Sequence, residues 1–463
     1  MEFTLQKVGI INNSTIKLDG LTVVCGSNNS GKSTIGKALY SSIESLCQID
    51  EKIKDELHII YRRALRSIVR WLDLESISKY VDFDRMQEEI TVDITMLLQN
   101  AYILRRRSNN IIDSFNKLRD AVEFLNKDVI MDYTQKYKSD LPKKFFAFIE
   151  NYAENRKKSI KYLNDYDSYF NNLDYEFFAK RSISSLFSTE FKSQIFPVNL
   201  KSKEKKSSFR LTQNQETGFN FSILNNGEKV LLNNSKLFVN NAIYIDDPYI
   251  LDRIEEYNYA FSHYDDNDNS DSHARKLIRM LNRESSQTLI EQVINEERYN
   301  SIVSKISSVI PGSISIKDTG VYYEEPNKEP LRVQNLATGS KLFSIIKTLI
   351  EKGEINYDTM LILDEPEAHL HPEWQNVFAE IIVLLVKELN VHVLLTTHSP
   401  NFLMAMEAFS KKHTISNKSN YYYAELTEDA YMVDYTCAND RLSKIYSSFA
   451  NPLIDVKRIK ENG

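Results

Sequence analysis

The feature that most constrains this chain is the stretch of residues 21–34, which reads LTVVCGSNNSGKST. Its first five residues predict a buried strand, and residues 34–39 predict the opening of a helix. Between them lies the pattern G-x-x-x-x-G-K-S, which is typical of a phosphate-binding loop. A chance glycine turn before a surface helix is the alternative. Because strand, loop and helix agree, the sequence predicts a nucleotide site here.

The residue types of this loop suit a nucleotide. Its glycines let backbone N–H groups close on phosphate oxygens. Lys32 supplies a positive charge for the β- and γ-phosphates, and Ser33 offers a hydroxyl to Mg²⁺. The candidate nucleotide-binding residues are therefore Gly26, Asn28, Asn29, Ser30, Gly31, Lys32, Ser33 and Thr34.

A second candidate stretch, TMLILDEPEAHLHP at residues 359–372, carries carboxylates. Residues 360–363 predict a buried strand that delivers Asp364 and Glu365 at its carboxyl end, where ligands bind in open α/β sheets. Asp364 can hold Mg²⁺ directly or through water, and Glu365 can orient and polarise the water that attacks the γ-phosphate. The alternative is a capped turn, but a phosphate loop without a magnesium carboxylate would be incomplete.

A third predicted strand, residues 391–395, ends in the sequence TTHSP. A histidine at this place, His398, can reach the γ-phosphate and sense it through a hydrogen bond. The alternative is a turn that caps the following helix. We expect His398 to join Glu365 as a catalytic residue.

The rest of the chain divides by its hydrophobic period. Strands are expected at residues 3–8 and 15–18, separated by a turn at residues 12–14. From residue 35 to about residue 187 apolar residues recur at helical spacing without sustained heptads, which predicts a helical bundle or bent hairpin. Between about residues 207 and 246 the period returns to two, which predicts strands.

Composition limits the partners and the compartment. The chain of 463 residues carries 58 Lys and Arg against 64 Asp and Glu, a net charge of -6, so any basic surface for nucleic acid must be local. Cys25, Cys47 and Cys437 lack metal-ligand spacing, which predicts free thiols in a reducing cytosol. No apolar run reaches the ~18 residues of a membrane span. We expect a cytoplasmic protein without a membrane partner.

Three motifs together resemble a known family. The loop GSNNSGKS, the segment LILDEPEAHLHP and the segment LLTTHSP resemble the ABC-type ATPase heads of the SMC-like and OLD-like classes. The resemblance implies an α/β fold, an ABC-type P-loop ATPase head with an antiparallel β subdomain and a large helical insertion. It implies ATP and Mg²⁺ as cofactors and ATP hydrolysis as the activity. Residues 1–41 would begin the head, 42–206 form the insertion, and 207–463 form the β subdomain and complete the head.

The family also carries a signature of the form L-S-x-G-x-K before the magnesium strand. This chain has LATGSK at residues 336–341. By resemblance, Thr338, Gly339 and Lys341 reach across a homodimer or higher oligomer of heads to the γ-phosphate on the other subunit. Ala337 stands where the family usually has serine. Whether Thr338 replaces the missing hydroxyl, and how fast the site turns over, therefore stays open.

Two pairs of residues have no assigned part in this resemblance. The glutamine loop of the family is not identifiable, although Asp246 and Asp247 follow a predicted strand at a plausible position with different chemistry. His369 and His371 lack Cys or carboxylate partners at ligand spacing, so dimer contact or packing is expected rather than a zinc site.

Within this class, the chain most resembles the stand-alone ATPase subunits of bacterial anti-phage defence systems, the Septu-type PtuA ATPases and their retron-linked relatives. The compact insertion, the LATGSK signature and the end of the chain soon after the histidine strand carry this resemblance. It implies a separate HNH-type nuclease subunit, which the ATPase regulates and positions. A non-hydrolytic scaffold held together by ATP and a DNA-repair ATPase are the alternatives.

Local basic clusters bear on a DNA partner. Arg62, Arg63, Arg66 and Arg70 fall on neighbouring turns of one predicted helix, and residues 105–107, 156–158 and 201–206 add basic runs. Such a stripe can contact phosphate backbones, and each contact adds salt dependence. The insertion also carries many acids, so a solvated surface is the alternative. DNA binding therefore stays open at this point.

Overall fold

The computed structural model describes residues 1–73, 76, 79, 81–82, 85–86, 111–137, 141–170, 175–197, 205–224, 229–257, 272–283, 289–317, 319–428 and 431–449. The chain forms two compact units. The first, which we call the head, comprises residues 1–47 and 179–463, and the second, the helical unit, comprises residues 48–178. The helical unit lies within residues 42–206, the range expected for the insertion.

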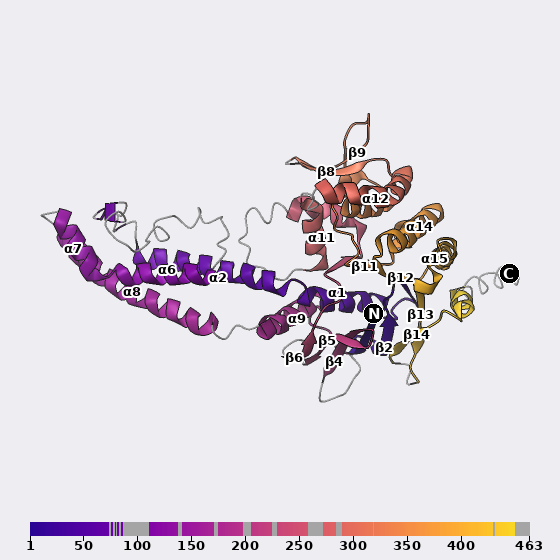
Figure 1. The fold of residues 1–463 in the computed structure, drawn as a ribbon, viewed down its shortest axis with the longest axis horizontal. Coiled ribbons are helices and arrows are strands. Elements are labelled where there is room, and N and C mark those ends of the chain that lie inside the picture. Colours follow the sequence, from indigo (N-terminus) through magenta and orange to yellow (C-terminus); the bar gives the residue numbers. More distant parts are fainter. Residues whose placement is uncertain are drawn as a thin grey trace, which may run out of the picture. The chain divides into compact units, whose positions relative to one another are not determined.

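Most strands of the head join in one sheet (Figure 1). The described strands are β1 (Glu2–Val8), β2 (Ile11–Lys17), β3 (Leu21–Cys25), β4 (Lys206–Gln213), β5 (Glu216–Leu224), β6 (Lys229–Ser235), β7 (Asn241–Ile245), β8 (Ser313–Lys317), β9 (Gly320–Glu324), β10 (Leu331–Arg332), β11 (Thr359–Asp364), β12 (His392–Thr397), β13 (Ser419–Leu426) and β14 (Val433–Cys437). Among them, 11 form a sheet in the order β6-β5-β4-β1-β2-β14-β13-β3-β12-β11-β7, and β10-β9-β8 form a small second sheet.

The described helices divide between the two units. The helical unit contains α2 (Ile49–Leu72), α6 (Ile111–Phe124), α7 (Lys127–Tyr137) and α8 (Lys143–Phe170). The head contains α1 (Lys32–Leu46), most of α9 (Tyr175–Phe191), α11 (His273–Asn282), α12 (Leu289–Val309), α13 (Thr338–Glu351), α14 (Pro372–Leu389) and α15 (Pro400–Lys412), with the short helices η2 (Pro248–Arg253), η3 (Val333–Asn335), η4 (Pro366–His369) and η5 (Ser416–Lys418).

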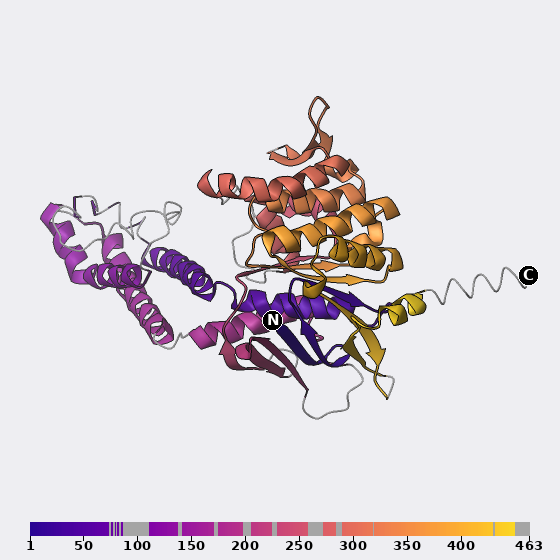
Figure 2. The same ribbon diagram turned by 45° about the vertical axis from the view of Figure 1, so that its right-hand side comes forward.

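The parallel strands β13, β3, β12, β11 and β7 position the candidate site. Helices α14 and α15 cover one face of these strands and α1 lies on the other (Figures 1 and 2). The backbone of α1 comes so near that a Cβ atom on Gly36 would lie 3.1 Å from Ile362 Cγ2. Because parallel strands end at the same edge, residues that follow β3, β11 and β12 meet there. The predicted α/β class is therefore confirmed.

The antiparallel part continues the same sheet through β2, β1, β4, β5 and β6. Phe209 and Phe221 stack here with ring centroids 5.1 Å apart, and Phe187 of α9 packs against both rings. This aromatic cluster attaches α9 to the strands. It explains why most of α9 belongs to the head, although the helical period continues to about residue 187.

The first turn lies earlier than the sequence analysis predicted. Residues 12–14 lie within β2, and the chain reverses at Gly9, which has a positive φ of 56°. Glycine adopts this conformation at little cost, so the turn forms there. The prediction of a turn at residues 12–14 is therefore wrong. Asn12 and Asn13 instead bind the Asp434 carboxylate of β14, with N···O distances of 3.2 and 2.7 Å.

The helical unit has its own core. Helices α2, α6, α7 and α8 bury a cluster that includes Tyr61, Phe115 and Phe145, and the rings of Tyr61 and Phe115 lie 5.1 Å apart. This arrangement is the bundle that the helical spacing predicts. None of the described helices is both long and apolar enough to cross a membrane.

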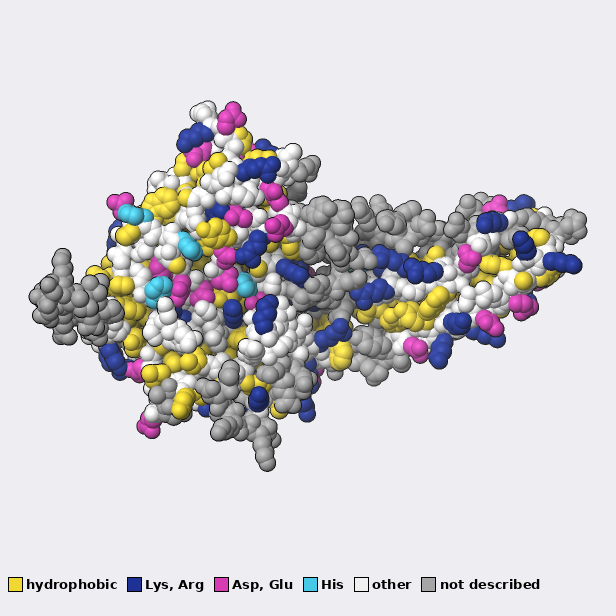
Figure 3. All heavy atoms as spheres, turned by 180° about the vertical axis from the view of Figure 1, so that it is seen from behind, with side chains coloured by type: hydrophobic (Ala, Val, Ile, Leu, Met, Phe, Trp, Pro, Cys, Tyr) yellow, Lys and Arg dark blue, Asp and Glu magenta, His cyan; other side chains and the backbone are white. Residues whose placement is uncertain are grey.

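The basic clusters have mixed surroundings. Lys and Arg side chains form a row along the helical unit in Figure 3, with acidic and apolar side chains beside them. Arg63, Arg66 and Arg70 are exposed on α2. Arg156 instead donates from Nε to the Val122 carbonyl oxygen at 2.8 Å and so attaches α8 to α6. Residues 105–107 and 201–204 lie outside the described residues.

One carboxylate ties three helices of the head together. Glu380 of α14 is 6% exposed and forms an ion pair with Lys305 of α12. It also accepts hydrogen bonds from Lys412 at 2.7 Å and from His413 at 2.9 Å, at the end of α15. Burial raises the pKa of Glu380, but these donors outweigh it and lower the pKa to about 2.

We expect Glu380→Gln to lower the free energy of unfolding at pH 7 by roughly 2 kcal/mol, because Lys305, Lys412 and His413 then lose the buried carboxylate that pairs with them. The pKa of Glu380 falls from 4.5 to about 2 on folding, so its stabilisation is complete above pH 4.5 and disappears as the pH falls through about 2. Urea unfolding of both proteins from pH 7 to pH 2 measures this difference. A difference that stays constant over that range would contradict the assignment.

Candidate functional site

The phosphate loop lies between two well-packed elements. Strand β3 is buried throughout, and helix α1 begins at Lys32, so the loop comprises residues 26–31. Gly31 has a φ of 89°, and a Cβ atom there would lie 2.7 Å from Ile10 Cγ2, which leaves room only for glycine. Asn28 and Asn29 are exposed at the tip of the loop, and Asn29 also has a positive φ of 62°.

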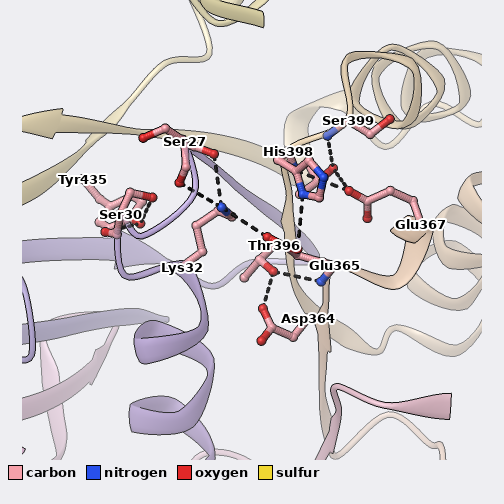
Figure 4. Close-up of polar contacts among 12 residues, drawn as sticks. Ser27, Ser30, Lys32, Asp364, Glu365, Glu367, Thr396, His398, Ser399 and Tyr435 are labelled. Atoms are coloured by element: carbon pink, nitrogen blue, oxygen red, sulfur yellow. Dashed lines mark hydrogen bonds and ion pairs between the residues drawn. The ribbon is translucent and has the colours of Figure 1, made fainter. Parts of the chain in front are cut away.

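The end of the phosphate loop leads directly into the first turn of α1, where an anion could bind. Ser30 is buried against Tyr435 of β14, whose hydroxyl donates to the Ser30 carbonyl oxygen at 3.0 Å (Figure 4). Ser33 and Thr34 stand half-buried in the first turn of α1. The first N–H groups of a helix have no partner within it, so the start of α1 offers donors for an anion.

Lys32 connects the loop to the acidic strand end. Its Nζ atom donates to the carbonyl oxygens of Gly26 at 3.2 Å and Ser27 at 3.0 Å, and it lies 3.2 Å from Glu365 Oε1 (Figure 4). The lysine side chain is only 5% exposed. A buried ammonium group requires a counter-charge, which Glu365 provides here and phosphate oxygens could provide in a nucleotide complex.

Asp364 is the last residue of β11, and each of its carboxylate oxygens accepts a hydrogen bond from a neighbouring side chain. Thr396 Oγ1 donates to Oδ1 at 2.5 Å, and the Tyr244 hydroxyl donates to Oδ2 at 3.1 Å. Burial raises the pKa of Tyr244 well above its usual value, and the charge of Asp364 adds to this effect, so the hydroxyl keeps its proton and donates. The remaining lone pairs of Asp364 could bind Mg²⁺, together with the Ser33 hydroxyl.

Glu365 is held between the loop and His398. Its backbone has a positive φ of 47°, and its N–H donates to Thr396 Oγ1 at 3.0 Å. Its second carboxylate oxygen, Oε2, lies 3.2 Å from His398 Nδ1. The two predicted catalytic residues are therefore in contact, and Glu365 also contacts Lys32. A carboxylate in this place can accept a proton from water, and the imidazole can donate to a phosphate oxygen.

A second acid, Glu367, supports this arrangement and was not singled out from the sequence. It is 2% exposed, and its Oε1 atom accepts hydrogen bonds from Thr397 Oγ1 at 2.5 Å and from the His398 N–H at 3.3 Å. Burial raises the pKa of Glu367 despite these donors. Glu367 therefore joins the segment after β11 to the segment after β12, and so fixes His398 beside Glu365.

The signature residues lie at a separate place in the head. Thr338 and Gly339 are the first two residues of α13. They line a pocket of about 290 Å³ whose walls are Ala337, Thr338, Gly339, His369, His371 and Trp374. The Thr338 hydroxyl lies 2.9 Å from the Tyr249 hydroxyl. No contact described here joins these residues to Lys32 or Glu365.

Lys341 forms an ion pair within the head. Its side chain is buried, and Nζ lies 2.7 Å from both carboxylate oxygens of Asp252 in η2. The Tyr249 ring centroid is 4.9 Å from the same nitrogen. In this structure Lys341 therefore packs α13 against η2, and its charge is paired with a carboxylate of the same head.

A last group of polar side chains lies beside Asp364. Asp246 directly follows β7, the parallel neighbour of β11, and its Oδ2 atom lies 3.1 Å from His273 Nε2. Burial raises the pKa of Asp246, but the hydrogen bond and charge of His273 outweigh it and lower the pKa. Asp246 thus occupies the strand end next to Asp364, where the family's glutamine loop was sought, with its carboxylate bound to a histidine.

The donors present fit a magnesium nucleotide. Lys32, the helix start and the exposed loop tip offer positive charge and N–H groups for phosphates, and Asp364 with Ser33 offers hard oxygen ligands. The buried lysine, bound in part by a carboxylate that phosphates could replace, is the observation that favours an anionic ligand.

Comparison with known proteins gives a family. The profile of the AAA ATPase domain family matches residues 9–403, whereas no curated protein gives a significant match. The chain is similar to the solved SMC head domain from Thermotoga maritima, with 11% identity over 94% of this chain and 97% of that chain and a TM-score of 0.37. An SmcHead bound to the C-winged helix domain of ScpA has 9% identity over 94% of this chain and 96% of that chain, with a TM-score of 0.37. An Smc head with an extended coiled coil, bound to the C-terminal domain of ScpA, from Pyrococcus furiosus has 10% identity over 96% of this chain and 98% of that chain, with a TM-score of 0.32. With TM-scores this low, we base no conclusion on these structures.

The family match includes the phosphate loop, the acidic strand end and His398. It therefore covers the residues that the structure brings together around Lys32. The ATPase class predicted from the three motifs is confirmed at this level. This chain belongs to the AAA ATPase domain family.

Proposed function

We propose that this chain binds ATP with Mg²⁺ and hydrolyses it. The observation that carries the proposal is the row of contacts from Lys32 through Glu365 to His398, with N···O distances of 3.2 Å at both steps. It brings a phosphate-binding cation, a water-activating carboxylate and a histidine to one strand edge. Phosphate-binding positive charge and a group that positions the attacking water are the recurring parts of phosphoanhydride hydrolysis, and the histidine can add a hydrogen bond to the γ-phosphate.

Each residue has a distinct role in this proposal. Lys32 and the loop N–H groups bind the β- and γ-phosphates, and Ser33 with Asp364 would hold Mg²⁺, which neutralises developing charge on the phosphates when bound. Glu365 orients the attacking water and accepts its proton, and His398 donates a hydrogen bond to the γ-phosphate. Glu367 and Thr396 hold these groups in place through the hydrogen bonds described above.

The proposal includes a dimer of heads. Thr338 and Gly339 line a pocket that does not include Lys32, so in this proposal a second copy of the chain supplies them to the site. The pocket carries His369, His371 and the start of α13, all of which suit an anion. Lys341 takes no direct part, because Asp252 already neutralises it.

We further propose that this cytoplasmic ATPase regulates an HNH-type nuclease in a bacterial anti-phage defence complex. This step rests on the sequence resemblance to the Septu-type and retron-linked ATPases, in the LATGSK signature and the compact insertion. ATP-driven pairing of heads would supply the two states that a regulatory subunit needs. Direct DNA contact by the exposed arginines of α2 belongs to the alternative function, a DNA-repair ATPase.

We expect Glu365→Gln to reduce the turnover number for ATP roughly 100-fold, because the amide cannot accept the proton of the attacking water. ATP binding should persist, since the substitution removes a negative charge near the phosphates. Phosphate release and analogue binding measure the two effects. Glu373→Gln, an exposed site in the first turn of α14, is the matched control and should leave both values unchanged. Equal turnover in Glu365→Gln and wild type would exclude Glu365 as the base, and ATP binding without hydrolysis by the wild type would favour the scaffold.

Dimerisation can be tested in the same background. In Glu365→Gln, where ATP persists, the mass measured by light scattering should double when MgATP is added. Gly339→Val should prevent this doubling while ATP still binds, because a side chain there meets Trp374 Cε3 at 3.0 Å and narrows the pocket. ATP-dependent doubling that survives Gly339→Val would show that α13 is not the contact surface.

The partner is identified by affinity purification of the full chain from its native host, with mass spectrometry and sizing of the complex. We expect an HNH-type nuclease to co-purify in a complex of fixed stoichiometry. Purification of the ATPase alone would contradict an obligate nuclease complex. ATP turnover that DNA stimulates without a nuclease, and that falls with added salt, would indicate the DNA-repair function instead.

A further inference from the structure

His273, the first residue of α11, has no part in the reaction proposed above, yet it is firmly fixed. Its side chain is 13% exposed. Nδ1 lies 2.7 Å from Glu190 Oε2 of α9, and Nε2 lies 3.1 Å from Asp246 Oδ2 at the end of β7. Its backbone N–H also donates to Glu190 Oε1 at 2.7 Å. Two carboxylates from different elements thus hold one imidazole ring.

The ring of His273 packs against the tyrosine that contacts Asp364. The centroids of His273 and Tyr244 are 4.7 Å apart, and Tyr40 of α1 packs against both rings at 6.0 and 6.1 Å. The Tyr244 hydroxyl then donates to Asp364 Oδ2 at 3.1 Å. A continuous path of contacts therefore runs from Glu190 through His273 and Tyr244 to Asp364.

The charges around His273 keep this path in one arrangement. Burial lowers the pKa of His273, but the hydrogen bonds to Asp246 and Glu190 outweigh it and raise the pKa to about 9. The imidazole is therefore a cation at neutral pH and donates from both nitrogens. One turn further along α11, Lys276 Nζ binds Glu44 Oε2 of α1 at 2.5 Å and Asn241 Oδ1 at 2.6 Å. Helix α11 is thus fixed to α9, α1 and β7.

We propose that His273 is a positioning residue for the magnesium carboxylate. By fixing the ring of Tyr244, it keeps the hydroxyl of that tyrosine on Asp364 Oδ2 while Thr396 holds Oδ1. The carboxylate then meets Mg²⁺ without reorienting, which is how residues behind a ligand increase metal affinity. The inference rests on the proposed ATPase function, and it assigns no chemical step to His273.

Calorimetry measures the affinity for a non-hydrolysable ATP analogue at increasing Mg²⁺ concentrations. The quantity compared is the Mg²⁺ concentration at which half of the magnesium-dependent gain in affinity is reached. Tyr244→Phe and His273→Gln should each raise this concentration roughly tenfold, with little change in analogue binding without Mg²⁺. The double variant should match Tyr244→Phe alone, because both changes act through the same hydrogen bond. Gln keeps an amide donor for one of the two carboxylates, which limits damage to the fold.

His413→Gln is the matched control, because His413 is 16% exposed and also binds a glutamate, Glu380. Among the described residues, no series of side-chain hydrogen bonds and ring contacts joins His413 to Asp364. It should not change the Mg²⁺ dependence, even where circular dichroism shows a lower melting temperature. Unchanged Mg²⁺ dependence in His273→Gln, or additive effects in the double variant, would overturn the inference and leave the proposed function intact. Failure of the wild type to bind the analogue would overturn both.

Discussion

The ion pair between Lys32 and Glu365 holds the candidate site together. Lys32 begins α1 and Glu365 follows β11, so this contact joins the two halves of the site across the sheet edge. The buried ammonium group cannot remain without a counter-charge, and the carboxylate supplies it while no phosphate is bound. A nucleotide that takes over this role would free Glu365 to act on water. In the function proposed above, the same interaction thus holds both side chains in place for the reaction.

The register of the sheet explains how neighbouring strands hold Asp364 and Glu365 in place. Strand β12 lies between β3 and β11, with Thr396 opposite Asp364 and Thr397 opposite Cys25. Thr396 therefore contacts both Asp364 and the backbone of Glu365, and the next residues bring His398 to Glu365. On the far side of β11, strand β7 adds Tyr244 to the same carboxylate.

The site residues that lie in short sequence motifs can be predicted from the sequence. The loop spacing and the strand ends predict Lys32, Asp364, Glu365 and His398, and the structure brings these four together, although their roles stay proposals. The sequence does not predict Tyr244, Glu367 and His273 as site residues. Their positions depend on strand register and burial, which no short motif encodes. The prediction of a turn near residue 12 is wrong because the chain already reverses at Gly9, and Asn12 binds Asp434 of a distant strand. The ion pair of Lys341 is likewise missed from the sequence, because Asp252 comes from a distant segment.

A crystal structure of the full chain with Mg²⁺ and a non-hydrolysable ATP analogue tests the central claim most directly. We predict that the β- and γ-phosphates lie between the loop and Lys32 Nζ, that Nζ leaves Glu365, and that Mg²⁺ lies beside Asp364 and Ser33. A nucleotide bound elsewhere, with Lys32 still paired to Glu365, would contradict the assignment of this edge of the sheet as the ATP site.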